Sequence, residues 1–292
     1  DSDRRIHLPP HRRRIGYVYQ DAQLFPHMSV ARNLDYGAAF APAEAVRPDR
    51  DRVTAALGIG HLLARRPVAL SGGEKARVAI GRALLSAPRL LLMDEPLASL
   101  DRALKREILT LIEDVVATFG VPVLYVSHAI EEVARLASHV VVIDHGRVVA
   151  SGTPEAVLLA SAGDDAAPVS IISGAIGSGG DFGLVAVEHP AGRLYLPQPR
   201  SAPGRKVRVL MRATDIAVAL TPPQGLSIRN VLGGEIEAIS GGFGPTALVR
   251  VRLPGGDVVT ASITRAAVAE LALAPGMAVH LLVKSVALAG AQ

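Results

Sequence analysis

Two adjacent carboxylates, Asp94 and Glu95, stand at the end of a short apolar run, 90–93. A run of this kind predicts a buried parallel strand, and open α/β sheets bind ligands beyond the carboxyl ends of such strands. A phosphoryl-transfer site needs one carboxylate that holds a metal ion and a second that activates water. The pair therefore indicates chemistry on phosphate groups, although two acids at a strand end are also common without that role.

A glycine pair, Gly72 and Gly73, follows Ser71 and precedes a helix-like run, 75–86, that Pro88 closes. Glycines at a helix start allow backbone N–H groups to approach an anion, and the helix dipole favours negative charge at that end. The stretch therefore predicts a second set of anion-binding donors.

Two further elements must position these groups. Residues 100–119 place apolar side chains at steps of three and four, which predicts an amphipathic helix that Gly120 ends. Residues 123–126 predict the next buried strand, and His128 follows it almost directly. A lone histidine is usually structural, but this one follows a core strand just after the paired acids.

These features resemble the ATP-binding cassette ATPases in order and spacing. LSGGE at 70–74 resembles the family signature, and LLLMDEP at 90–96 resembles the Walker B strand. Gln20 looks like the Q-loop glutamine, Asp101 like the D-loop aspartate and His128 like the switch histidine.

The resemblance implies an α/β fold for residues 1–160, a truncated P-loop NTPase-like nucleotide-binding domain with ATP and Mg²⁺ as cofactors. It also implies a head-to-tail homodimer, in which the signature of one protomer faces the nucleotide of the other. The residues that it implies are Glu95 (general base), His128 and Gln20 for catalysis, Ser71, Gly72, Gly73, Asp94 and Asp101 for the nucleotide, and Asp94 with Gln20 for Mg²⁺.

The loop G-x-x-x-x-G-K-[ST], whose backbone N–H groups cradle phosphates, does not occur ahead of Gln20. The family places that loop several tens of residues before the Q-loop, and only nineteen residues precede Gln20. The chain therefore resembles the carboxyl-terminal part of a longer, amino-terminally truncated subunit. We expect the chain alone to bind ATP poorly and not to hydrolyse it.

Composition bounds the class of protein. The 292 residues are 49% apolar and 20% charged, which indicates about two globular domains. Cysteine is absent, so disulfides and thiolate sites are excluded. The net charge of +4 is modest, and no stretch approaches the ~18 apolar residues of a membrane span.

The sequence changes character after a small-residue linker at 161–168. Beyond it, short strand-like runs alternate with glycine and proline, which predicts a small all-β barrel. The runs lie at 169–172, 184–187, 207–211, 216–220, 249–253, 258–263 and 279–283. The expected parts are the nucleotide-binding domain at 1–160, a linker and accessory β segment at 161–224, and a barrel at 225–292.

The last part is similar to the molybdopterin-binding-protein (Mop) domain, an OB-like TOBE barrel. The motifs S-x-R-N at 227–230 and K-S at 284–285 carry the likeness, whereas the hairpin 241–245 departs from the family's more polar one. A tetrahedral dianion needs cationic and neutral donors, and these side chains supply both. The residues implied to bind molybdate or tungstate are Ser227, Arg229, Thr264, Lys284 and Ser285.

Together the two resemblances imply the ATP-hydrolysing subunit of a bacterial ABC-type molybdate importer, with an oxyanion-sensing domain. The implied partners are transmembrane permease subunits and a periplasmic molybdate-binding protein, with the subunit peripheral on the cytoplasmic face of the inner membrane. Nucleic acid is not an expected partner, because no helix-turn-helix precedes the barrel. The alternatives are an importer ATPase for ferric ion, sulfate, sugar or polyamine, and a non-catalytic molybdate binder.

Overall fold

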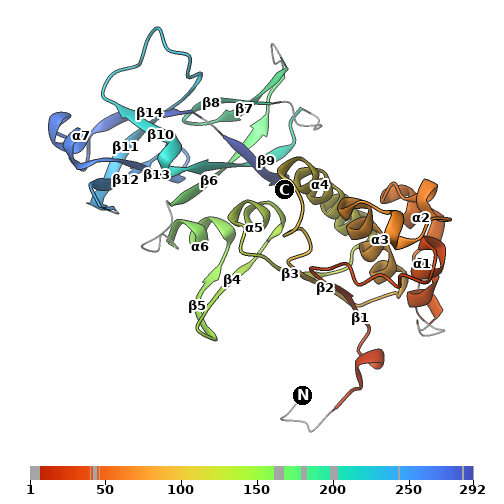
Figure 1. Cartoon of the computed structure of the whole chain (residues 1–292). Coiled ribbons are helices and arrows are strands. Elements are labelled where there is room, and N and C mark those ends of the chain that lie inside the picture. Colours follow the sequence, from red (N-terminus) through yellow and green to blue (C-terminus); the bar gives the residue numbers. More distant parts are fainter. Residues whose placement is uncertain are drawn as a thin grey trace. The chain divides into compact units, whose positions relative to one another are not determined.

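The computed structural model describes residues 7–39, 41, 45, 47–160, 168–178, 183–197, 203–242, 244–284 and 286–291. The chain divides into two compact units, Asp1–His128 and Ala129–Gln292. The first unit is mixed α/β, and the second consists mainly of β-strands (Figure 1). The predicted linker at 161–168 lies outside the described residues except for Pro168.

A three-stranded parallel sheet, in the order β1-β2-β3, forms the centre of the first unit. Its strands are β1 Ile15–Val18, β2 Leu90–Asp94 and β3 Val123–Val126. Leu91 and Met93 are fully buried in the core, as the apolar run predicts for a central strand. Because all three strands run the same way, their carboxyl ends meet at one edge of the sheet.

Four helices accompany this sheet, and Figure 1 shows α1 and α2 beside α3. They are α1 Val30–Ala39, α2 Arg50–Ala56, α3 Gly72–Leu85 and α4 Arg102–Phe119. The predicted amphipathic helix is α4, and Gly120 ends it in the left-handed conformation at φ 62°. Its amide donates to the carbonyl oxygen of Val116, which is the αL cap that the glycine predicted.

The second unit begins with two short helices and a hairpin. These are α5 Ile130–Leu136, α6 Pro154–Ala160, and the antiparallel strands β4 Val140–Asp144 and β5 Arg147–Gly152.

Two five-stranded antiparallel sheets make up the rest of the second unit. Their strands are β6 Val169–Ile176, β7 Leu184–His189, β8 Gly192–Pro197, β9 Lys206–Arg212, β10 Ile216–Ala219, β11 Asn230–Gly241, β12 Thr246–Arg252, β13 Val258–Thr264, β14 Ala278–Val283 and β15 Ala287–Ala291. A short helix, α7 Arg265–Glu270, follows β13.

The two sheets have the same topology with one strand exchanged. Their orders are β15-β9-β6-β7-β8 and β10-β14-β11-β12-β13, so β6–β10 match β11–β15 one by one. Each half gives its last strand to the other half's sheet, since β10 pairs with β14 and β15 pairs with β9. We call residues 169–219 the first half and residues 227–291 the second half.

Both halves bury their apolar faces in one core. Ile172 and Val209 from the first half and Ile236 and Val249 from the second half belong to the same buried cluster. The segment that the sequence marked as accessory therefore supplies half of the β structure. The boundary at residue 225 stays a prediction, and the two segments on either side of it pack as one body.

Candidate nucleotide and oxyanion sites

The carboxyl edge of the three-stranded sheet brings Glu95 and His128 together. The amide of Glu95 donates to the carbonyl oxygen of Val126 at 2.9 Å, which holds the end of β2 beside β3. Glu95 turns the chain with φ at 44°, a left-handed conformation that is strained for a residue with a side chain. Its Oε1 then lies 2.9 Å from Nδ1 of His128. The paired side chains are 29% and 75% exposed, so substrate can reach them.

Asp94 lies at the same edge and has a partner that the sequence did not indicate. The phenol of Tyr17, in β1, donates to Oδ2 of Asp94 at 3.0 Å. This hydrogen bond is the main reason that the pKa of Tyr17 is raised. Tyr17 also stacks on Tyr19, with ring centroids 4.1 Å apart. Only the pairing of β1 with β2 places Tyr17 there, and no local motif could have shown it.

Gln20 follows β1 by two residues and is exposed at this edge of the sheet. Magnesium is usually held by one or two carboxylates together with substrate phosphates, and it prefers oxygen ligands. The Asp94 carboxylate and the Gln20 amide oxygen are donors of that type. Within the part of the chain that the structure describes, no group of three or more His, Cys, Asp or Glu residues could hold a metal ion.

The segment after Gln20 is anchored to two helices. Asn33 of α1, fully buried, accepts from the amide of Phe25 at 2.8 Å and donates to its carbonyl oxygen at 3.1 Å. Arg82 of α3 donates to the carbonyl oxygens of Gln23 and Ala22 at 2.8 and 3.2 Å. The loop that carries Gln20 toward α1 is thus tied to the helix that begins with the glycine pair.

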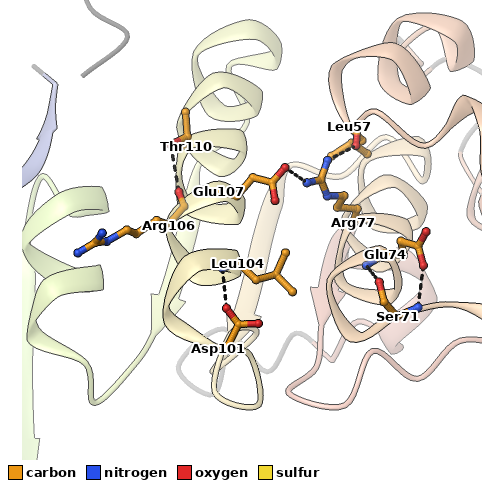
Figure 2. Close-up of polar contacts among 9 residues, drawn as sticks. All are labelled: Leu57, Ser71, Glu74, Arg77, Asp101, Leu104, Arg106, Glu107 and Thr110. Atoms are coloured by element: carbon orange, nitrogen blue, oxygen red, sulfur yellow. Dashed lines mark hydrogen bonds and ion pairs between the residues drawn. The ribbon is translucent and has the colours of Figure 1, made fainter. Parts of the chain in front are cut away.

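Ser71, Gly72 and Gly73 form the start of α3, where a capping box closes the first turn. The hydroxyl oxygen of Ser71 accepts from the amide of Glu74 at 3.3 Å, and Glu74 Oε2 accepts from the amide of Ser71 at 2.7 Å. Figure 2 shows both bonds. The amides of the two glycines belong to the unpaired first turn, and the Ser71 hydroxyl keeps its own hydrogen to donate. These free donors are compatible with an anion at this helix end, and anion binding there stays a prediction.

The glycines also let α3 approach α4. A Cβ on Gly73 would lie 2.7 Å from Cδ2 of Leu104, so no larger residue fits without displacement. Arg77 ties the same helices, because its guanidinium lies 2.6 Å from the Glu107 carboxylate and donates to the carbonyl oxygen of Leu57 (Figure 2). The two glycines therefore allow close packing against neighbouring leucines, whether or not their amides also donate to an anion.

Asp101 caps α4. Its Oδ1 accepts from the amides of Ala103 and Leu104, both at 3.0 Å. This is the usual role of aspartate at a helix start, and the structure gives that role plainly. A contact of Asp101 with nucleotide remains a prediction from the resemblance.

A pocket of about 450 Å³ in the second unit brings three of the five predicted oxyanion residues together. The residues that line it are Leu184, Tyr195, Ser227, Ile228, Arg229, Asn230 and Lys284. The two charged groups in this set are cations, and the hydroxyls of Ser227 and Tyr195 accompany them. Ser285 lies outside the described residues. Tyr195 and Leu184 come from the first half, which the sequence did not connect with the motifs.

Thr264 lies elsewhere in the second half. Its hydroxyl oxygen caps α7 by accepting from the amide of Ala267 at 3.1 Å. It ends β13, and β13 contacts β6 of the first half through a bond from the Thr260 amide to the Ser170 hydroxyl oxygen. The strands β11 and β8 correspond to β6 and β13 in the shared topology. Between them, Asn230 Oδ1 accepts a hydrogen bond from the Tyr195 amide of β8. Thr264 is not among the residues that line the pocket.

No helix within the described part of the chain is both long and apolar enough to cross a membrane.

Comparisons with known proteins match both units. A family model described as ABC transporter matches residues 2–98, and one described as TOBE domain matches residues 226–289. The molybdenum import ATP-binding protein ModC of Mesorhizobium japonicum is 48% identical over 98% of this chain and 78% of its own length. The proteins of the same name from Rhizobium etli and Rhizobium meliloti are each 46% identical, over 98% and 99% of this chain and 81% and 82% of their own. A solved structure, cbiO1 of Clostridium perfringens, part of the ABC transporter complex cbiONQ, is 33% identical over 50% of this chain and 59% of that one, with a TM-score of 0.44.

Proposed function

Because this chain belongs to the family of molybdenum import ATP-binding proteins, we propose that it is the ATP-hydrolysing subunit of an importer for molybdate or tungstate. The observation that carries the proposal is the meeting of Asp94, Glu95 and His128 at one sheet edge. The cationic pocket in the second unit supports the choice of an oxyanion.

In the hydrolytic step, Glu95 accepts a proton from the attacking water. Its carboxylate is oriented by His128, because Nδ1–H can donate to Oε1 at the observed 2.9 Å. In the imidazolium form, in which both ring nitrogens carry a hydrogen, Nε2 of His128 would donate to the γ-phosphate. Asp94 and Gln20 would hold Mg²⁺, which neutralises charge on the transferring phosphate when it is bound.

The start of α3 serves a second nucleotide. The Ser71 hydroxyl and the amides of Gly72 and Gly73 would donate to the γ-phosphate of ATP held by the partner in a head-to-tail homodimer. Asp101, at the start of the neighbouring α4, would lie at the same interface. The unpaired amides of the first turn of α3 favour the triphosphate there, whereas the Ala103 and Leu104 amides of α4 already donate to Asp101.

The proposed partners follow from this arrangement. The homodimer would drive transmembrane permease subunits from the cytoplasmic face of the inner membrane, and a periplasmic protein would deliver molybdate. Oxyanion bound by Ser227, Arg229 and Lys284 would restrain transport when cytosolic molybdate is abundant. Positive groups with a neutral donor are the chemistry that a tetrahedral dianion needs.

Titration calorimetry of the 292-residue chain with molybdate, tungstate and sulfate tests the oxyanion part. We expect molybdate and tungstate to bind more tightly than sulfate. Lys284→Ala should lower the molybdate affinity about tenfold or more, since a charge-assisted bond is lost. Lys105→Ala, in α4 of the first unit, is the matched control and should bind as the wild type does. Equal affinity for sulfate and molybdate would favour an importer of another solute.

A further inference from the structure

The oxyanion pocket is built by both halves of the exchanged sheets. Tyr195 lies in β8 of the first half, whereas Arg229 precedes β11 and Lys284 follows β14 in the second half. All three line the same 450 Å³ pocket. Residues 225–292 alone would therefore lack one wall of the pocket. The complete pocket requires the first half as well.

The Tyr195 ring lies against the cation that the sequence motif supplies. The guanidinium carbon of Arg229 is 4.6 Å from the centroid of the ring. This distance is within the range of a cation–π contact. Arg229 is exposed, and a free arginine side chain loses considerable rotamer entropy when it is ordered by a ligand. Contact with the ring orders the guanidinium before any anion arrives.

Asn230 holds the backbone of Tyr195. Its Oδ1 accepts from the amide of Tyr195 at 2.7 Å, and its Nδ2 donates to the carbonyl oxygen of Tyr195 at 3.4 Å. Asn230 is only 7% exposed, so these bonds are shielded from water. Because Asn230 directly follows Arg229, these bonds hold the backbone of Tyr195 next to the backbone of Arg229.

Further charged side chains lie near the ring. Arg193 lies two residues before Tyr195 and pairs with Glu188 at 2.8 Å. Hydrogen bonds, first to Glu188 and then to Tyr195, raise the pKa of Arg193. Among the described residues that line the pocket, the charged ones are Arg229 and Lys284, and both attract a dianion.

We propose that Tyr195 is a positioning residue for oxyanion binding, whose ring holds the Arg229 guanidinium in the orientation that receives a tetrahedral dianion. The inference rests on the proposed oxyanion function and assigns a role to a residue outside the stretch 226–289 that matches the TOBE domain. It makes the first half a part of the sensor.

Calorimetric titration of the whole chain with molybdate tests this role through two substitutions. Tyr195→Phe keeps the aromatic face and should bind within twofold of the wild type. Tyr195→Leu keeps apolar bulk without that face and should bind about three- to tenfold more weakly. In an Arg229→Ala background the leucine substitution should have no further effect, because Tyr195 acts through Arg229.

The outcomes separate this inference from the proposal beneath it. Tyr36→Leu, a tyrosine of α1 in the first unit, is the control and should leave molybdate affinity unchanged. Wild-type chain that binds no molybdate would overturn both proposals. Loss of affinity in Arg229→Ala with none in Tyr195→Leu would overturn the inference alone. So would a tenfold loss in Tyr195→Phe, or a leucine effect of the same size in both backgrounds.

Discussion

Nδ1 of His128 lies 2.9 Å from Oε1 of Glu95, although 33 positions separate the two residues. The contact depends on the parallel pairing of β2 with β3, which aligns Asp94 with Val126 and brings both strand ends to one edge. A carboxylate can only accept, so the hydrogen of this bond belongs to the imidazole. An acid held in this way is suited to receive a proton from water.

His128 and Glu95 should act as one unit in hydrolysis. In a form of the protein extended by an upstream phosphate-binding loop, His128→Ala should lower kcat about 100-fold or more, because the base loses its orienting partner. Single-turnover hydrolysis of ATP measures this. In the Glu95→Gln variant, where hydrolysis should already be at background, adding His128→Ala should have no measurable effect. A His128→Ala rate close to that of the wild type would show that Glu95 does not depend on this partner.

The capping box of α3 should make a pH-dependent contribution to stability. The pKa of Glu74 lies below its ordinary value, first because the Ser71 amide donates to the carboxylate. A lowered pKa in the folded state stabilises the protein above the unfolded-state value near 4.5, and this contribution is lost as pH falls through the folded-state value.

We therefore expect Glu74→Gln to be less stable than the wild type at pH 7 by a few tenths of a kcal/mol. Urea unfolding between pH 3 and pH 7 should show this difference shrinking in acid. Glu270→Gln, at the last residue of α7, removes a carboxylate away from any helix start and is the control. A difference that grows in acid would contradict the capping role.

Gly73 leaves little room for a side chain. A Cβ there would meet Cδ2 and Cδ1 of Leu104 at 2.7 and 2.8 Å, so Gly73→Ala should destabilise the chain by up to about 1 kcal/mol, because the Leu104 side chain must shift and this offsets the helix propensity of alanine. Chemical denaturation measures the loss, and Leu104→Ala in the same chain should recover part of it. Gly60→Ala is the control, because a Cβ at Gly60 meets nothing within 4 Å. Equal stability of the two glycine variants would refute close packing at Gly73.

Asn33 should be needed to hold the segment that follows Gln20. Asn33→Ala leaves the amide of Phe25 without its side-chain acceptor in a buried place, which costs about 1–3 kcal/mol. Hydrogen exchange at Phe25 should become faster in this variant, and Asn33→Asp should keep that amide protected. Unchanged exchange in the alanine variant would show that the clamp is not needed.

The elements of the first unit were largely predictable from local pattern. The apolar run at 90–93, the three- and four-residue steps of α4, and Gly120 at its end each gave the observed structure. Local signals suffice there because burial and capping act over a few residues. Tyr17 beside Asp94 could not be foreseen, since it depends on the register of two strands 77 positions apart.

The second unit was predictable in class but not in assembly. Strand-like runs indicated an all-β body, yet β8, β11 and β15 were missed. The twelve-residue β11 was missed because glycines and glutamates interrupt its apolar pattern. The exchange of β10 and β15 rests on pairings between distant segments, for which periodicity contains no information. For the same reason the sequence grouped Thr264 with the pocket residues, which the structure does not, and it gave no sign of Tyr195. Tyr195 contacts Arg229 only because the two halves pack together.

The most direct measurement is ATP hydrolysis and ATP binding by Glu95→Gln, in the protein extended by an upstream phosphate-binding loop. Replacing the carboxylate by an amide keeps the shape of the side chain and removes the base. We predict that hydrolysis falls to background while ATP is still bound. Turnover near the wild-type rate would contradict the role of Glu95 and, with it, the assignment of this sheet edge as the hydrolytic site.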